Sequence, residues 1–226
     1  MKKINKSKID WPFPNLHCWH PVIGCPRNCF DGKCWAMAVN KRLINIEDQT
    51  GVQMSGWIED FSKPELIEAE LNRPFPGKPS TIFVGSRSDC EFWEDDWWDK
   101  IGERIHKDGK KHEFLFLSKD PNTYDYIDLP KNCTLGLTVT FKDPERDLAS
   151  ITELYELNND YNRLFLSIEP LLGSVPYLAK AFVDRFHQVI CGAMNQGNKP
   201  TKEMIESAQK YLPSDTWWKK NIRRFM

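Results

Sequence analysis

Residues Gly24 to Ala36 read GCPRNCFDGKCWA, which places three cysteines within ten residues of a loop that contains glycine and proline. Three thiolates at this spacing can ligate three corners of a cubane iron–sulfur cluster and leave the fourth iron open to another ligand. Zinc also accepts thiolates, but a structural zinc site has four ligands, and His17, Cys18 or His20 would have to supply the fourth. Three ligands with an open corner favour a catalytic site over a structural one. The loop therefore predicts an iron–sulfur cluster in preference to a zinc site.

The composition is that of a folded protein, with 226 residues of which 40% are hydrophobic and 28% charged. These values permit a buried core and no linker divides the chain, so we expect one domain spanning residues 1–226. The formal net charge of −1 gives the chain as a whole no electrostatic attraction to nucleic acid or membrane. Residues 1–10 lack the apolar segment of a secretion signal, and no 18-residue apolar run exists. We therefore expect a cytoplasmic protein with reduced cysteines and no membrane contact.

Short apolar strands alternate with helical patterns along the chain. The expected strands are 17–24, 81–85, 114–117, 135–140, 164–170, 189–193 and 216–220. The expected helices are 34–46, 62–72 with Ser62 as its cap, 97–109, 143–155, 177–186 and 201–211. Strands this apolar are typical of a parallel sheet buried on both faces. This α/β pattern of about seven units predicts an incomplete TIM-like (β/α)6–7 barrel; a doubly wound open sheet is the alternative, although the Rossmann glycine fingerprint is missing.

In parallel β/α folds the ligand site lies at the carboxyl ends of the strands, so the residues that follow each strand are the candidates. The first strand leads into the cysteine loop, and the next five end in small polar or charged groups: Ser86, Ser88 and Asp89; Ser118, Lys119 and Asp120; Thr138 and Thr140; Ser167 and Glu169; Cys191 and Asn195. Strand ends meet solvent in most proteins, so polarity alone has a plain structural explanation. Glu169 stands out because it follows an apolar run, where a carboxylate without a partner or ligand is costly to bury.

The residues around the cysteine loop resemble a radical S-adenosylmethionine (SAM) family of unknown function that is frequent in phage genomes. Trp19 to Cys25 (WHPVIGC) is similar to the family's Trp-Asn-Pro-Val-Thr-Gly-Cys, and Cys34-Trp35-Ala36 is similar to its Cys-Tyr-Ala. Further similar segments follow in family order: FVGSRSD at 83–89, LSKDP at 117–121, LGLTV at 135–139, FLSIEPLLG at 165–173 and VICG at 189–192. The cysteine spacing differs from the family's, because three and then four residues separate the cysteines here.

The resemblance implies a radical SAM barrel in which Cys25, Cys29 and Cys34 ligate a [4Fe–4S] cluster and SAM chelates the fourth iron. One electron from the reduced cluster then cleaves SAM to a 5′-deoxyadenosyl radical, which abstracts hydrogen from a substrate. The implied SAM ligands are Ser86, Ser88 and Asp89 for the amino group, Lys119 for the carboxylate, and Thr138 and Glu169 for the ribose hydroxyls. Alternatively, Glu169 faces the substrate as a catalytic residue. Cys191 is a candidate hydrogen donor, although a lone cysteine is more often a small buried apolar residue.

Such an enzyme needs an electron donor, such as a flavodoxin or ferredoxin, and its substrate is unidentified, with a nucleotide or nucleic acid as one class. The rival interpretation is a non-enzymatic zinc-binding module with Cys18, Cys25, Cys29 and Cys34 as ligands. It would present Trp217, Trp218 and the basic run 219–224 to nucleic acid, with basic groups for phosphates and aromatic rings for bases. Brown colour in the anaerobically purified protein separates the two, because zinc proteins are colourless.

Overall fold

The computed structural model describes residues 3–27, 29, 32, 34–51, 56–125, 127–157, 163–194 and 199–226. The chain belongs to the α/β class, since helices alternate with strands and most strand pairs are parallel. It divides into two compact units. The first comprises Met1–Ser7, Asn15–Phe116 and Asp128–Pro130, and the second comprises Lys8–Pro14, Leu117–Ile127 and Lys131–Met226. None of the described helices has the length and apolar character needed to cross a membrane.

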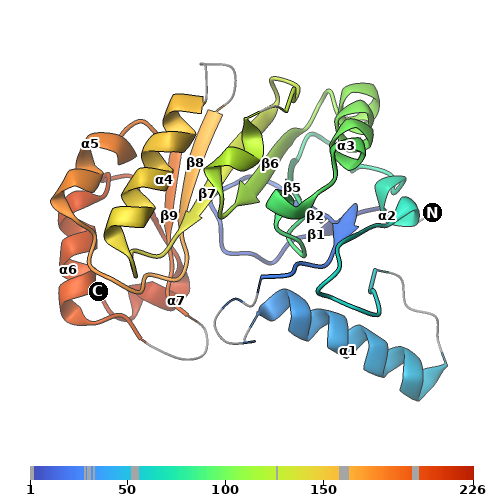
Figure 1. The fold of residues 1–226 in the computed structure, drawn as a ribbon, viewed down its shortest axis with the longest axis horizontal. Coiled ribbons are helices and arrows are strands. Elements are labelled where there is room, and N and C mark those ends of the chain that lie inside the picture. Colours follow the sequence, from blue (N-terminus) through green and yellow to red (C-terminus); the bar gives the residue numbers. More distant parts are fainter. Residues whose placement is uncertain are drawn as a thin grey trace. The chain divides into compact units, whose positions relative to one another are not determined.

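The first unit contains strands in the order β1 (Asn5–Lys6), β2 (His17–Trp19), β5 (Thr81–Val84) and β6 (Glu113–Ser118), although the last two residues of β6 belong to the second unit. β1 pairs antiparallel to β2, whereas β2, β5 and β6 are parallel to one another. A separate antiparallel pair joins β3 (Val22–Ile23) to β4 (Glu65–Leu66). The helices are α1 (Trp35–Thr50), α2 (Glu68–Leu71) and α3 (Asp95–Asp108), with the 3₁₀ turn η1 (Cys90–Phe92) between β5 and α3. Figure 1 shows α1 in blue and α3 in green.

Helix α3 carries the apolar stripe that the sequence predicts for 97–109. Trp98, Ile101 and Ile105 are buried on one side, and Gly109 follows the last turn. The ring of Trp98 lies 5.5 Å from that of Phe116 in β6, so the stripe packs on the sheet. The predicted helix is confirmed, with Trp98 rather than Trp97 as the inward tryptophan.

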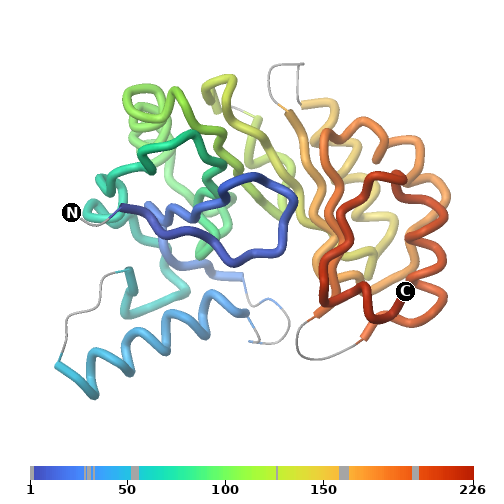
Figure 2. Tube along the Cα trace, turned by 180° about the vertical axis from the view of Figure 1, so that it is seen from behind, coloured from blue at the N-terminus to red at the C-terminus, as the bar shows by residue number. Residues whose placement is uncertain are grey.

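The second unit contains parallel strands in the order β7 (Cys133–Val139), β8 (Arg163–Ile168), β9 (Gln188–Cys191) and β10 (Trp217–Trp218). Its helices are α4 (Pro144–Leu157), α5 (Lys180–Val183), α6 (Lys202–Tyr211) and α7 (Lys220–Arg223), with 3₁₀ turns η2 (Pro121–Tyr124) and η3 (Tyr177–Ala179). α4 lies in front of β8 and β9 in Figure 1, and Figure 2 shows these strands from the other side, so α4 covers one face. The segment Lys8–Pro14 also belongs to this unit, and its Trp11 and Phe13 rings pack edge-on against Phe165 of β8.

The helix expected at 62–72 with Ser62 as its cap is wrong. Glu65 and Leu66 form β4, and α2 starts only at Glu68. The pairing of β4 with β3 satisfies backbone groups and buries Val22, which the local capping pattern does not do.

Two other expected elements are shorter in the structure. The strand expected at 17–24 is split into β2 and β3, which lie in different sheets. The helix expected at 177–186 is reduced to η3 and the four-residue α5. The strand pairings among the described residues close no barrel, so the TIM-like barrel stays a prediction, as does the single domain.

Candidate functional site

The cysteine loop connects β3 to α1 in the first unit. The backbone N–H of Cys25 donates to the carbonyl of Phe61 at 2.7 Å, which anchors the start of the loop. Cys25 is buried in an apolar cluster built from β3, α1 and the 58–61 segment, and Cys34 packs against the same cluster from the end of the loop. The first and third cysteines therefore lie on one patch of core, and Cys29 lies on the chain between them.

Arg27, between the first two cysteines, attaches the loop to the segment after β5. Its Nε donates to Glu91 Oε2 at 2.8 Å, its Nη2 pairs with the same carboxylate, and its Nε lies 3.6 Å from Asp89 Oδ2. Its guanidinium carbon lies 5.5 Å from the centre of the Phe92 ring. Burial lowers the pKa of Arg27, but the hydrogen bond to Glu91 and the charges of Asp89, Glu91 and Cys29 outweigh burial, so the pKa lies above its ordinary value. A charged guanidinium thus faces Asp89.

The three acceptors expected to bind the SAM amino group follow β5, and each has a protein partner. Ser86 Oγ lies 3.4 Å from His20 Nδ1, and Ser88 Oγ accepts from Trp93 Nε1 at 2.9 Å. Asp89 is buried and caps η1. A ligand ammonium would therefore compete with groups of the protein at each of these positions.

Burial sets the protonation states beside these acceptors. It lowers the pKa of His20 to about 3, and the positive charge of Arg87 adds to the effect, so the imidazole is neutral at pH 7. Burial also raises the pKa of the Cys18 thiol, which hydrogen bonds with Ser7 and Ser86 offset only in part. Both the His20 imidazole and the Cys18 thiol are therefore uncharged at pH 7.

Arg87 is buried in the middle of this segment and connects the base of the cysteine loop to α1. Its Nη1 donates to the Gly56 carbonyl and its Nη2 to Asn40 Oδ1 at 3.3 Å, while Gly24 N donates to the Arg87 carbonyl at 3.2 Å. Its Nε is buried and has no hydrogen-bond partner among the described residues. Burial lowers the pKa of Arg87, and the charge of Glu70 acts in the opposite direction. This arginine therefore holds together the elements that carry the first unit's candidate residues.

In the second unit, Glu169 directly follows β8, and protein groups occupy both of its oxygens. Trp11 Nε1 and Ser167 Oγ donate to Oε2 at 2.8 and 3.0 Å, and Lys219 Nζ forms an ion pair with Oε1. The side chains of Glu169 and Lys219 are 20% and 17% exposed. Gly192 leaves room for the pair, since a Cβ there would lie 2.9 Å from Glu169 Oε1. The partner that the sequence requires for a carboxylate in this position is thus present within the protein.

The other predicted residues of the second unit lie on the neighbouring strands or turns. Cys191 ends β9 and is fully buried. Burial raises the pKa of its thiol and the charge of Glu169 adds to the rise, so the thiol stays protonated. Thr138 in β7 is the register partner of Ser167 in β8, and Lys119 lies half-buried in the turn after β6.

The structure distributes the predicted site residues over the two units. The first unit contains Cys25, Cys29, Cys34, Ser86, Ser88 and Asp89, and the second contains Lys119, Thr138, Glu169 and Cys191. Within the part of the chain that the structure describes, no group of three or more His, Cys, Asp or Glu side chains is arranged to hold a metal ion. All seven cysteines are described, and none is in a disulfide. Asn195 lies outside the described residues.

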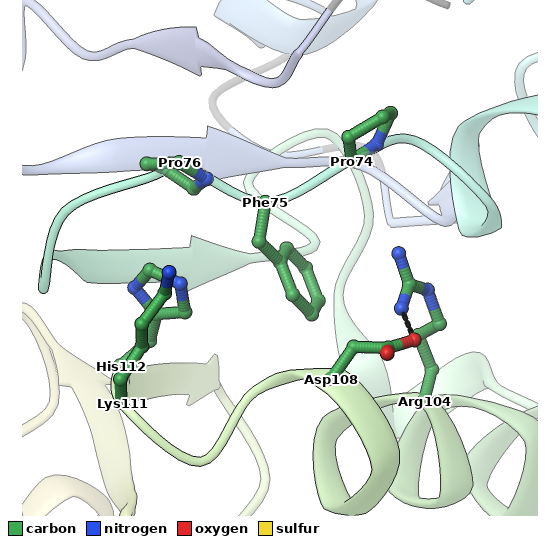
Figure 3. Close-up of a pocket in the computed structure, with 7 residues that line it drawn as sticks. All are labelled: Pro74, Phe75, Pro76, Arg104, Asp108, Lys111 and His112. Atoms are coloured by element: carbon green, nitrogen blue, oxygen red, sulfur yellow. Dashed lines mark hydrogen bonds and ion pairs between the residues drawn. The ribbon is translucent and has the colours of Figure 1, made fainter.

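A hollow of about 270 Å³ lies beside the start of β6 in the first unit (Figure 3). Arg104 and Lys111 line it, but both cations have backbone partners. Arg104 Nε and Nη2 donate to the Leu71 and Arg73 carbonyls at 3.3 and 3.2 Å, and Lys111 Nζ donates to that of Gly77 at 2.8 Å. These contacts attach the loop after α2 to α3 and to the turn that follows it. The two cations thus have a structural role, and the hollow is not a candidate ligand site.

Sequence reasoning did not connect four side chains with these sites: Trp11, Arg27, Arg87 and Lys219. Trp11 and Lys219 are 158 and 50 residues away from Glu169 along the chain, so no local pattern connects them to it. For Arg27 the sequence contains a usable signal, which is its position between the candidate ligands Cys25 and Cys29. A cation beside candidate thiolates suggests an electrostatic role.

The sequence profile of a family described as "Protein of unknown function (DUF5131)" matches residues 6–224. The comparisons with curated proteins and with solved structures found no match. The matched range includes the cysteine loop of the first unit and Glu169 with its partners in the second.

Proposed function

This chain belongs to the DUF5131 family, and from its own residues we propose that it is a radical SAM enzyme with a [4Fe–4S] cluster. When bound, the cluster and SAM supply a 5′-deoxyadenosyl radical that abstracts hydrogen from a substrate. The observation that carries the proposal is the loop between β3 and α1, which bears Cys25, Cys29 and Cys34 with the first and third thiols on one apolar cluster. Apolar surroundings suit this chemistry because they exclude water from a reactive centre.

The donor set fits a cluster with one open iron better than a closed zinc site. The loop offers three thiols, whereas the fourth ligand of a zinc site would have to come from outside the loop, from Cys18 in β2. Arg27 supports the loop from within, since its ion pairs with the segment after β5 hold the chain between Cys25 and Cys29.

Polar groups at the carboxyl ends of the strands would bind SAM and the substrate. Ser86, Ser88 and Asp89 are the groups proposed for the amino group of SAM, and Lys119 is the group proposed for its carboxylate. Thr138 and Glu169 are proposed for the ribose hydroxyls, with Glu169 facing the substrate as the alternative. Cys191 keeps its proton, and only the protonated thiol can donate a hydrogen atom. The proposal includes a cytoplasmic location and an electron donor such as a flavodoxin or ferredoxin. The substrate is unidentified, and a nucleotide or nucleic acid is one class that it includes.

Two contacts of the second unit weigh against the zinc-binding module as the alternative. Trp217 Nε1 donates to the Asp10 carbonyl at 3.1 Å, and Lys219 is paired with Glu169. Both side chains were assigned to nucleic acid in that interpretation, and both have partners within the protein.

Anaerobic reconstitution with iron and sulfide, followed by dithionite and SAM, tests the proposal through the formation of 5′-deoxyadenosine. Product is expected from the wild type and lost in Cys25→Ala, Cys29→Ala and Cys34→Ala. Cys133→Ala, which changes a buried cysteine of β7, is the matched control and should retain the product. One zinc per chain, with no cluster and no deoxyadenosine, would replace the proposal with the zinc module.

A further inference from the structure

Three donors from separate parts of the second unit meet on one carboxylate. Trp11 comes from the N-terminal segment, Ser167 from β8 and Lys219 from the position after β10, and all three bind Glu169. The two neutral donors take Oε2 and the cation takes Oε1. An ionised carboxylate accepts at both oxygens, so this set of donors selects one orientation of the side chain.

The backbone fixes the starting point of each side chain. Gly192 N donates to the Ile168 carbonyl at 3.0 Å and Lys219 N donates to the Cys191 carbonyl at 2.9 Å, so the hydrogen bonding between strands continues past the ends of β9 and β10. Lys219 then reaches Glu169 across Gly192, where a Cβ would lie 2.9 Å from both Glu169 Oε1 and Lys219 Cδ. The absence of a side chain at 192 thus opens the path for the ion pair.

Lys220, the next residue in the chain, differs from Lys219 in what it contacts. Its side chain is exposed, and its backbone N–H donates to Asp10 Oδ2 at 2.6 Å. A substitution of the Lys220 side chain therefore removes one positive charge from the same corner without touching Glu169. The two adjacent lysines form a matched pair for experiment.

We propose that Lys219 is a positioning residue that holds the Glu169 carboxylate in its working orientation, with Trp11 as its counterpart on the other oxygen. The role of that carboxylate in SAM or substrate binding rests on the proposed function, but the arrangement does not. Removing one partner of a shielded ion pair leaves an uncompensated charge, so the pair resists opening. The corner after β10 then belongs to the functional site of the second unit rather than to a basic tail.

Indole NMR tests the arrangement without any activity. Protein labelled with ¹⁵N at the tryptophan indoles gives an N–H signal for each indole, and Trp11→Phe identifies the signal of Trp11. Lys219→Met and Glu169→Gln should both move this signal, Lys219→Arg should return it close to its wild-type position, and Lys220→Met should leave it in place. Glu169→Gln establishes that the Trp11 signal reports on this carboxylate, and Lys219→Gln repeats the test of Lys219 if Lys219→Met does not fold. A Trp11 signal that the Lys219 variants leave in place would overturn the proposal.

Deoxyadenosine formation per cluster tests the role. Lys219→Met should lose about tenfold or more, because a misplaced catalytic or binding group costs rate steeply. Lys219→Arg should keep most of the activity and Lys220→Met all of it. Full activity in Lys219→Met, or an equal loss in Lys219→Met and Lys220→Met, would contradict positioning. If the wild type forms no deoxyadenosine, the proposed function fails, while the indole signals still decide whether Lys219 positions Glu169.

Discussion

Lowering the pH should destabilise the protein through His20. Burial lowers the pKa of His20 to about 3 in the folded protein, against about 6.5 for an exposed histidine. Between these two values the unfolded chain binds a proton that folded His20 does not, so this contribution to stability is complete above pH 6.5 and is lost as the pH falls toward 3. From pH 7.5 to pH 5 the loss is about 2 kcal/mol. It is the same for any folded pKa below about 4, because the ring then stays neutral over the whole range.

Urea unfolding of the wild type and of His20→Gln at pH 7.5 and pH 5 measures this loss as a difference between two proteins. The wild type should lose about 2 kcal/mol more than the variant. Burial also lowers the pKa of His112, but that residue is present in both proteins and its effect cancels. His106→Gln changes an exposed histidine of α3 and should keep the full wild-type loss. An equal loss in the wild type and His20→Gln would refute the neutral imidazole of His20.

Two substitutions and one chemical modification test the packing in other parts of the protein. Gly102→Ala should raise the free energy of unfolding by about 0.5–1 kcal/mol in urea titrations, because Gly102 lies inside α3 with open space for a Cβ. Gly136→Ala should lower it by about 1–3 kcal/mol, because the new Cβ would overlap the buried Phe165 ring; a variant as stable as the wild type would contradict that contact. Iodoacetamide at pH 8 should leave Cys191 unmodified until urea is added, as peptide mass spectrometry can show, since the thiol is buried and its pKa is raised.

Helix α3 shows which part of the fold a sequence can predict. Its apolar residues recur with the helical period and Gly109 marks its end, so all the information lies within one short segment. The same holds for α6, where Thr201 accepts a hydrogen bond from Met204 N as its cap. Segments of this kind fold as their local pattern predicts because tertiary contacts only reinforce it.

The region after Ser62 shows where local patterns fail. A serine followed three residues later by Glu65 has the form of a capping box, but Glu65 is instead paired with Ile23 across β3 and β4. The partner strand lies about 40 residues earlier in the chain, and a capping pattern contains no information about it. The prediction was therefore reasonable locally and was overridden by a long-range pairing.

The candidate site residues also differ in how far the sequence predicts them. The carboxylates are visible in local sequence patterns, whereas their cationic partners are brought to them by the fold. Asp89 and Glu169 are visible in the sequence as carboxylates at strand ends. Considered alone, Asp89 suggests the amino group of SAM as its ligand, and Glu169 suggests a ribose hydroxyl or the substrate. In the structure Arg27 lies 3.6 Å from Asp89 and Lys219 is paired with Glu169. Each carboxylate is thus half of an ion pair, and a ligand must either bind beside the pair or displace a cation that the protein itself supplies. The chemistry of both sites follows from the pair, and the distant partner in each is the part that no local pattern contains.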